Sequence, residues 1–330
     1  MSNILIIGAG SMGTAFSFPC TDNNHNVSII GTHLENDFID QVNSKRRHPA
    51  LNCELPEKIK FIKFDKLNEE INKKIDLIVI AVVSKGIEWI SLELSKVLKK
   101  NIPILVLTKG LAIHNNEYEL LTDKMERLLK KNGIKATNIS IAGGPCLAKG
   151  LSDKAHTSVV FANKNIEIVN QIKNLIETNY YHIFTSSDVA GVGICAAIKN
   201  IFSMAIGTTK HLNTAAFLIQ QSINEMTVFV KKLNGKKETV MGLAGIADLY
   251  VSADGGRNSK MGKYLGEGMT FREAKSKKMP NVTVEGADLA LEIGKKIKSD
   301  FEDNKLPLMI SMINTICDEK PLNIEWKKFK

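Results

Sequence analysis

Short apolar runs alternate with helix-like segments through the first half of the chain. The run 76–83, DLIVIAVV, is apolar after its first residue, which is typical of a strand buried on both faces of a parallel sheet. Runs of this kind predict strands at residues 3–8, 27–30, 59–64, 76–83, 102–108, 138–143, 157–162 and 181–185. Segments such as 88–100 and 116–131 lie between them and predict helices. The alternation indicates an α/β fold with a Rossmann-type, doubly wound, mostly parallel sheet.

The pattern changes near residue 187. Few strand-like runs follow, and helical periodicity predicts helices at residues 188–207, 213–233, 286–298 and 305–318. We therefore expect two domains, an α/β domain over residues 1–186 and an all-helical domain over residues 187–330.

The composition is that of an ordinary globular protein, with 44% hydrophobic and 24% charged residues among 330. The first residues, MSNILIIGAG, lack the basic region of a signal peptide, and their apolar run ends in glycines. The stretch 189–207 is the best candidate for a membrane span, but it contains Lys199, Asn200 and several glycines. We expect no membrane span and a cytoplasmic protein.

The five cysteines are scattered, and neither they nor the seven histidines show the spacing of a metal-binding motif. Free thiols and no protein-bound metal are the prediction. The net charge of +9 comes from lysines spread along the chain, with no basic stripe that includes aromatic residues. This argues against a nucleic-acid partner and is compatible with attraction of phosphorylated small molecules.

The sequence GAGSMG at residues 8–13 is a G-x-G-x-x-G motif that directly follows a predicted strand and opens a helical pattern. In that context Gly8 permits a tight turn, Gly10 lets the backbone approach a pyrophosphate, and Gly13 allows close packing of helix and strand. The free N–H groups at the helix start would face the phosphates. The motif predicts a dinucleotide site.

The end of the second strand indicates which dinucleotide binds, because an acid there bonds the ribose hydroxyls of NAD. Here the strand runs into Thr32 and His33, and no acid occurs before Glu35. A basic cluster that includes Arg46 follows at residues 45–48. This combination favours NADP, although the cluster could also be a solvated loop, and use of both NADP and NAD stays open.

A lysine stands in the middle of the most apolar helical segment. Lys199 has Cys195 and Phe202 one turn away, and no carboxylate lies within a turn of it. Because a buried, unpaired ammonium is costly, Lys199 either reaches the surface or has a function. Burial would lower the pKa of its amine, and a nearby Asp would moderate that shift, which is what an acid/base group of a dehydrogenase needs.

Four other stretches place polar groups in unusual settings. Lys109 follows the strand 102–108, at the edge of a sheet where ligands bind in open α/β folds. The segment 142–150, AGGPCLAKG, follows another strand. Asp248 is a lone acid among small and apolar residues, and Arg257 follows two glycines, a setting suited to a phosphate.

These stretches, in order along the chain, resemble the NAD(P)-dependent glycerol-3-phosphate dehydrogenases. GAGSMGTAFS is similar to the N-terminal fingerprint of that family, and TKGL to its substrate-lysine motif. AGGPCLA resembles S-G-P-S-x-A, and AIKNIFSMAIG resembles A-L-K-N-x-x-x-I-A-x-G. GLAGIADLYVS resembles G-L-x-G-x-G-D-L-x-x-T, GGRN its R-N pair, and TVEG its V-V-E-G. The likeness covers nearly the whole chain.

The resemblance implies a role for each matching position. Lys199 and Asp248 match the catalytic pair, with Lys199 as general acid/base. The positions matching substrate contacts are Lys109, Gly144, Cys146, Asn200, Ser252, Arg257 and Asn258, with Arg257 on the phosphate. The positions expected at the cofactor are Gly8, Gly10, Ser11, Met12, Gly13, Thr32, His33, Arg46, Lys109, Ala148, Arg257, Thr283 and Glu285.

The resemblance also implies reversible reduction of dihydroxyacetone phosphate to sn-glycerol 3-phosphate by a homodimer. In bacterial and archaea-like members the reduction usually supplies glycerophospholipid synthesis. The chain departs from the family pattern at several positions. Cys146 replaces a common Ser, Ser252 a Thr, Ala247 a Gly, Gln221 an Arg and Val83 a Pro.

Two other functions fit part of the pattern. A β-hydroxyacid dehydrogenase or a ketopantoate-reductase-like enzyme would also combine a Rossmann domain with a helix lysine. Those enzymes space their Lys and Asn by three or four residues, whereas Lys199 and Asn200 are adjacent. A non-catalytic, nucleotide-sensing Rossmann protein would leave Lys199 and Arg257 without a role.

Overall fold

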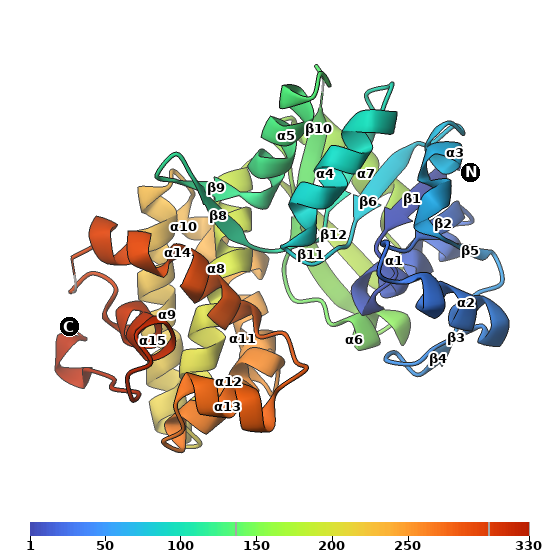
Figure 1. The fold of residues 1–330 in the computed structure, drawn as a ribbon. Coiled ribbons are helices and arrows are strands. Elements are labelled where there is room, and N and C mark those ends of the chain that lie inside the picture. Colours follow the sequence, from blue (N-terminus) through green and yellow to red (C-terminus); the bar gives the residue numbers. More distant parts are fainter. Residues whose placement is uncertain (136, 303, 330) are drawn as a thin grey trace. The chain divides into compact units, whose positions relative to one another are not determined.

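The structure, a computed structural model, describes residues 1–330 except 136, 303 and 330, and its chain forms two compact units (Figure 1). The first unit contains Met1–Thr108, Leu121–Ala142 and Cys146–Val189. The second contains Lys109–Leu120, Gly143–Pro145 and Ala190–Lys330. Two short segments that precede residue 187 thus belong with the C-terminal helices.

The first unit is built on an eight-stranded sheet, in the order β12-β11-β10-β7-β6-β1-β2-β5 (Figure 1). Its strands are β1 (Asn3–Ile7), β2 (Asn26–Ile30), β5 (Ile59–Ile62), β6 (Leu77–Ile80), β7 (Pro103–Val106), β10 (Asn138–Gly143), β11 (Thr157–Ala162) and β12 (Tyr181–Ser186). The pairs β5·β2, β2·β1, β1·β6, β6·β7, β7·β10 and β11·β12 are parallel. All eight predicted strands are present, and the Rossmann-type fold class is confirmed.

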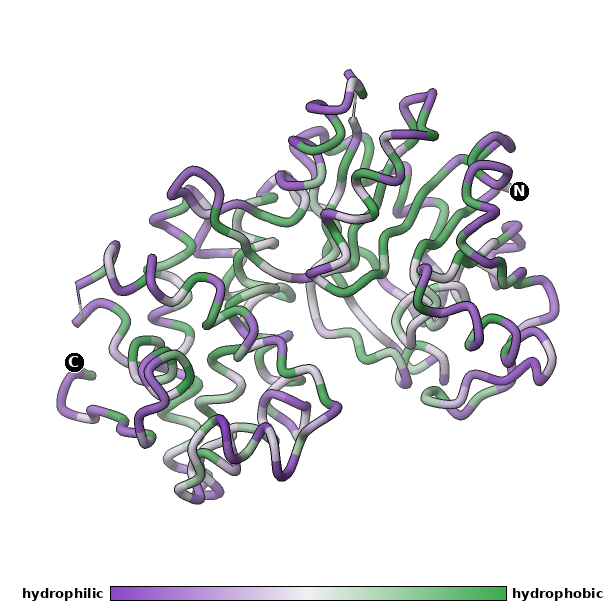
Figure 2. Tube along the Cα trace, in the orientation of Figure 1, coloured by the Kyte–Doolittle hydropathy of each residue, from purple (hydrophilic) through white to green (hydrophobic). Residues whose placement is uncertain are grey.

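Both faces of this sheet are covered by helices. Ile4 and Ile6 of β1 belong to one apolar core, and Leu5 and Ile7 belong to another on the opposite face. The first core also contains residues of α1 (Ser11–Asp22), α2 (Asn36–Lys45) and α7 (Ile166–Ile176). The second contains residues of α3 (Leu67–Ile71), α4 (Gly86–Val97) and α5 (Leu121–Lys131). Figure 2 shows the strands as hydrophobic along most of their length, as burial on both faces requires.

The prediction of a helix over residues 116–131 is wrong for the first part of that segment. Glu117–Leu120 is a strand, β9, that pairs antiparallel with β8 (Leu111–His114), and α5 begins only at Leu121. The two strands are joined by Asn115 and Asn116, which have φ values of 49° and 59°. Asn tolerates this left-handed conformation, and two such residues in succession form the tight turn that hairpins favour.

Apart from this hairpin, the described residues of the second unit form helices and their connecting segments. Its helices are α8 (Val189–Gly207), α9 (Leu212–Lys232), α10 (Lys237–Val240), α11 (Asp248–Ala253), α12 (Arg257–Gly266), α13 (Phe271–Lys278), α14 (Glu285–Asp300) and α15 (Pro307–Cys317). A π-helical turn at Leu243–Ala247 precedes α11. The helices predicted at 188–207, 213–233, 286–298 and 305–318 correspond to α8, α9, α14 and α15.

Helix α8 is the centre of the second unit. It is long and apolar enough to cross a membrane, but 83% of its most apolar window is buried within the protein. It lies against α12 at backbone distance, since a Cβ atom at Gly262 would come within 1.9 Å of the carbonyl oxygen of Met204. Only glycine allows this approach, so the two helices are held in a fixed relation.

A buried carboxylate joins α15 to α9. Glu225, which is 1% exposed, accepts hydrogen bonds from the backbone N–H groups of Leu308 (2.7 Å) and Met309 (2.8 Å) and from the Gln221 amide (2.8 Å). These bonds satisfy N–H groups at the start of α15. Burial nevertheless raises the pKa of Glu225 from 4.5 to about 7, against the lowering effect of the hydrogen bonds.

We expect the stability of the second unit to fall as the pH rises through this range. A carboxyl whose pKa is raised by folding stabilises the fold while protonated, so its contribution is complete below pH 4.5 and is lost towards pH 7. The change from 4.5 to about 7 corresponds to roughly 3 kcal/mol in the free energy of unfolding. Glu225→Gln, which does not titrate, should lack this loss.

Urea unfolding of both proteins at several pH values measures the difference. Trp326 lies against Phe217 of α9, with ring centroids 6.1 Å apart, and reports on the second unit when the other tryptophan is removed by Trp89→Phe. The expectation would be contradicted if the free energy of unfolding changed with pH in the same way in the parent and in Glu225→Gln.

Candidate active site

Lys199 is buried in the middle of α8 and is held by two residues of α11. Its Nζ donates to Oδ1 of Asp248 and to Oγ of Ser252. Lys199 is 5% exposed and Asp248 is 2% exposed. Asp248 and Ser252 are four residues apart on α11, so they face the same side of that helix. Lys199 has no carboxylate within a turn of it in sequence, and its charge is paired instead with that of Asp248, 49 residues later in the chain.

A second lysine uses the other oxygen of the same carboxylate. Nζ of Lys109 lies 2.7 Å from Oδ2 of Asp248 and 3.4 Å from the carbonyl oxygen of Gly144. Both Lys109 and Gly144 come from the short segments that belong to the second unit. The sequence indicated Lys109 and Asp248 separately, and nothing in it showed that they pair.

One carboxylate thus faces two ammonium groups in a largely buried place. Burial, and next the charge of Lys109, lower the pKa of Lys199 to about 8, while Asp248 and Glu285 act in the opposite direction. The Lys109 side chain is 26% exposed, whereas that of Lys199 is 6% exposed. Lys199 is therefore the amine that can release and regain a proton near neutral pH.

A second group of predicted residues connects α8, α12 and α14. Asn258 donates from Nδ2 to Oδ1 of Asn200 (3.0 Å) and accepts at its own Oδ1 from the backbone N–H of Gly286 (2.8 Å). Arg257, the first residue of α12, forms an ion pair with Glu285, the first residue of α14. Because Arg257 is exposed and stands at a helix N-terminus, both it and the helix start suit an anion.

The glycine loop lies in the first unit and fits a pyrophosphate. Gly8 has φ +109°, and a Cβ there would lie 2.7 Å from the carbonyl oxygen of Ala81. A Cβ at Gly13 would lie 2.1 Å from the carbonyl oxygen of Gly8. Gly10, in contrast, is exposed, has open space beside it and caps α1 without a side-chain hydrogen bond. Ser11 and Met12 follow, so backbone N–H groups at the start of α1 border that space.

Of the other residues predicted at the cofactor, two lie after β2 and one is bonded to a loop of the first unit. Thr32 and His33 follow β2 after one glycine, Gly31, and the His33 ring lies against Trp89 with centroids 4.8 Å apart. Arg46 donates to the carbonyl oxygens of Pro56 and Ile59. Leu34 and Val83, after β2 and β6, are 82% and 68% exposed and offer apolar surface at the carboxyl edge of the sheet.

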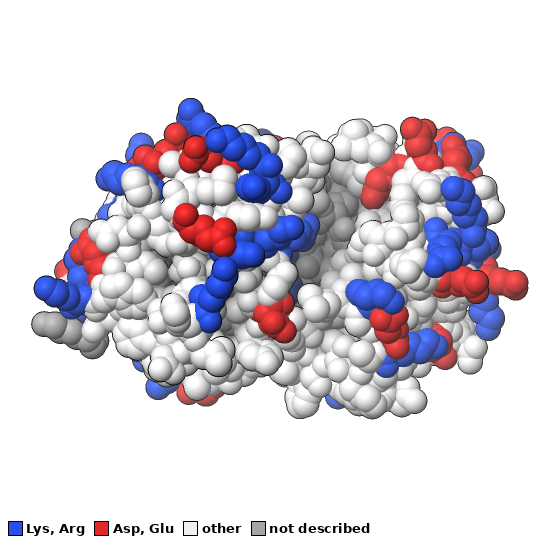
Figure 3. All heavy atoms as spheres, turned by 90° about the horizontal axis from the view of Figure 1, so that it is seen from below, with Lys and Arg blue, Asp and Glu red and all other residues white. Residues whose placement is uncertain are grey.

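The remaining predicted residues are Cys146, Ala148 and Thr283. Cys146 and Ala148 belong to the first unit, at the start of α6 (Ala148–Ser152). Thr283 is exposed in the loop before α14. On the face drawn in Figure 3, Lys and Arg side chains are interspersed with Asp and Glu.

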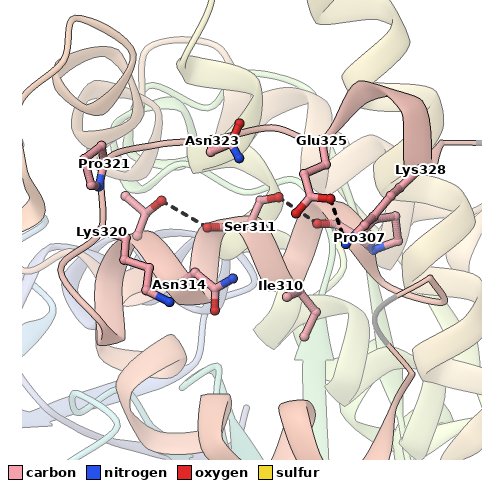
Figure 4. Close-up of a pocket in the computed structure, with 10 residues that line it drawn as sticks. Pro307, Ile310, Ser311, Asn314, Lys320, Pro321, Asn323, Glu325 and Lys328 are labelled. Carbon is pink, nitrogen blue, oxygen red and sulfur yellow. Dashed lines mark hydrogen bonds and ion pairs between the residues drawn. The ribbon is translucent and has the colours of Figure 1, made fainter.

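A small cavity of about 220 Å³ lies elsewhere in the second unit, between α15 and the C-terminal segment (Figure 4). The hydroxyl of Ser311 donates to the carbonyl oxygen of Pro307, and Lys328 pairs with Glu325, three residues earlier in the C-terminal segment. None of the predicted site residues lines this cavity.

Two family models match this chain. One, described as the NAD-dependent glycerol-3-phosphate dehydrogenase N-terminus, matches residues 3–169, and its C-terminal counterpart matches residues 188–325. The chain belongs to the NAD-dependent glycerol-3-phosphate dehydrogenase family. This membership confirms the predicted family and the predicted enzyme class, an NAD- or NADP-dependent oxidoreductase acting on a CH–OH group.

Curated relatives cover almost the whole chain. A glycerol-3-phosphate dehydrogenase [NAD(P)+] of Fusobacterium nucleatum is 32% identical, over 97% of this chain and 93% of that protein. An NADP(+)-dependent glycerol-3-phosphate dehydrogenase of Archaeoglobus fulgidus is 28% identical, over 90% of this chain and 91% of that protein.

Solved structures show the same fold. The crystal structure of glycerol-3-phosphate dehydrogenase from Coxiella burnetii has a TM-score of 0.85 at 24% identity and covers 97% of this chain and 96% of its own. A PanE/ApbA family ketopantoate reductase from Ralstonia eutropha has a TM-score of 0.60 at 13% identity. This ketopantoate reductase therefore shares the architecture, whereas both family matches support the glycerol-3-phosphate dehydrogenases.

Proposed function

We propose that this protein interconverts dihydroxyacetone phosphate and sn-glycerol 3-phosphate with NAD or NADP. The observation that carries the proposal is the buried amine of Lys199, held by Asp248 and Ser252 beside Lys109. Such an amine can give a proton to an alkoxide or take one from an alcohol near neutral pH. The nicotinamide, when bound, supplies or accepts the hydride.

Each residue has a defined task in this proposal. In the reducing direction, the ammonium of Lys199 protonates the C2 oxygen as negative charge develops on it. Asp248 orients that ammonium through Oδ1, and Lys109 adds positive charge close to the same oxygen. In the oxidising direction, neutral Lys199 takes the hydroxyl proton.

The phosphate of the substrate is proposed to bind at Arg257 and the start of α12. A guanidinium has five donors in a planar fork, and the contact with Glu285 involves only Nη2. Asn258 fixes the backbone of this region through its bonds to Asn200 and Gly286. The phosphate would thus be held by a rigid helix end.

We further propose that the enzyme acts in the cytoplasm as a homodimer and supplies glycerophospholipid synthesis. The support is the resemblance to family members with these properties. Light scattering after size-exclusion chromatography tests the dimer, and a mass of 36.4 kDa in solution would contradict it.

A spectrophotometric assay tests the reaction. We expect dihydroxyacetone phosphate to cause oxidation of NADH or NADPH, and Lys199→Ala to abolish turnover while leaving dinucleotide binding intact. Lys210→Ala, at an exposed lysine outside the site, is the control and should behave as the parent enzyme. No oxidation of either dinucleotide by the folded parent protein would refute the proposal.

The pH dependence should follow Lys199. Reduction needs the ammonium, so its kcat/KM should fall tenfold per pH unit above about 8, whereas oxidation needs the neutral amine and should rise to a plateau there. Lys109→Gln removes a charge that lowers the pKa of Lys199, so the fall of kcat/KM for reduction should begin at a higher pH. If the fall begins at the same pH in Lys109→Gln, it reports the titration of a group other than Lys199.

Arg257→Ala should chiefly weaken binding of the phosphorylated substrate. Loss of a charge-assisted contact predicts a KM for dihydroxyacetone phosphate about 10- to 100-fold higher, with a smaller change in kcat. Arg272→Ala, which removes an exposed arginine paired with Glu319, should leave KM unchanged. An unchanged KM for Arg257→Ala would show that the phosphate binds elsewhere.

A further inference from the structure

The choice between NAD and NADP depends on what stands beside the adenosine ribose, after β2 and next to the glycine loop. The relatives do not decide it, since one is named as NADP(+)-dependent and another as NAD(P)+. The residues of the first unit must therefore be compared directly. Two sets matter, the acid Glu35 and the basic cluster at residues 45–48.

Glu35 is brought back to the end of β2 by the turn that precedes α2. Its backbone N–H bonds to the carbonyl oxygen of Thr32 (3.0 Å), which reverses the chain. Its Oε2 then accepts from the backbone N–H of Thr32 (2.6 Å) and from that of Ala9 (3.3 Å). Ala9 lies between Gly8 and Gly10, so the carboxylate connects the end of β2 with the glycine loop.

The basic cluster does not supply a partner for a 2′-phosphate at this place. Arg46 caps the C-terminal end of α2, whereas Glu35 caps its N-terminal end, and a helix of this length separates its two ends by about 15 Å. The Arg46 guanidinium donates to the carbonyl oxygens of Pro56 and Ile59 and lies 6.0 Å from the Phe61 ring. It closes the loop that follows α2.

The neighbours of Arg46 lie at the same end of α2. Lys45 stands in the last turn of α2, Arg47 donates to Oδ1 of Asn52, and His48 is 2% exposed. Nδ1 of His48 accepts from the backbone N–H of Leu51. Burial lowers the pKa of His48, which disfavours a positive charge on this ring near Ala9 and Glu35.

We propose that Glu35 binds the ribose hydroxyls of NAD(H) and repels the 2′-phosphate of NADP(H), so that this enzyme prefers NAD(H). A carboxylate accepts two hydroxyl hydrogen bonds, whereas a phosphate of charge near −2 would face a like charge there. The proposal rests on the proposed function only in that a dinucleotide binds at the glycine loop. It is the opposite of the preference for NADP expected from the sequence.

Equilibrium binding of NADH and NADPH to the full-length protein, followed by nicotinamide fluorescence without substrate, tests the proposal. We expect NADH to bind at least tenfold more tightly than NADPH. Glu35→Gln should reduce that ratio by about tenfold or more, because the amide removes the charge and keeps the shape. Asp37→Asn, at an exposed acid in the first turn of α2, is the matched control and should not change the ratio.

Two outcomes would overturn the proposal. One is a parent protein that binds NADPH as tightly as NADH, which needs no variant and so does not depend on the folding of Glu35→Gln. The other is a Glu35→Gln protein that loses affinity for both dinucleotides equally, since Glu35 would then only support the loop. Because the measurement involves no turnover, its result is separate from that of the assay with dihydroxyacetone phosphate.

Discussion

The arrangement of the second unit depends on one carboxylate that is shared by two lysines. Asp248 is almost completely buried, and an unpaired charge in that place would cost several kcal/mol. It can be compensated only if α8 presents Lys199, the π-helical turn delivers α11 at residue 248, and the segment after β7 brings in Lys109. These requirements fix the relative positions of three elements that are far apart in sequence. Because two ammonium groups share one carboxylate, the pKa of Lys199 is lowered and this amine exchanges its proton easily.

Close packing of the helix backbones supports this centre. Gly262 lets α12 approach α8, and Gly286 lets α14 approach it, since a Cβ at Gly286 would lie 2.4 Å from the carbonyl oxygen of Asn200. At this separation the short side chain of Asn258 reaches both Asn200 and Gly286. The glycines therefore determine where Arg257 and Glu285 begin their helices, and a side chain at either glycine would move the whole group.

The sequence predicts the layers of the fold better than the contacts within the site. Apolar runs located every strand of the large sheet, and these runs are least interrupted in β1, β6 and β7, where burial on both faces favours apolar side chains. The strand Glu117–Leu120 was missed because its short pattern also suits a helix, although the preceding Asn115-Asn116 was an available turn signal. The sequence indicated which residues are candidates for the site but not their contacts with one another. Loop conformations decide the Lys109–Asp248 pair, the bonds of Arg46 to carbonyl oxygens and the contact of Glu35 with the end of β2, and hydrophobic periodicity gives no information about loop conformations.

The Lys109–Leu120 segment has a consequence for protein engineering. The chain passes between the two units five times, at residues 108–109, 120–121, 142–143, 145–146 and 189–190. A chimaera joined at residues 186–187 would therefore take Lys109 from one parent and Lys199 and Asp248 from the other. Exchange of the dinucleotide-binding unit therefore requires a graft of three separate segments. Lys109, Lys199 and Asp248 would all come from the same parent only if the segment Lys109–Leu120 were kept with the C-terminal helices.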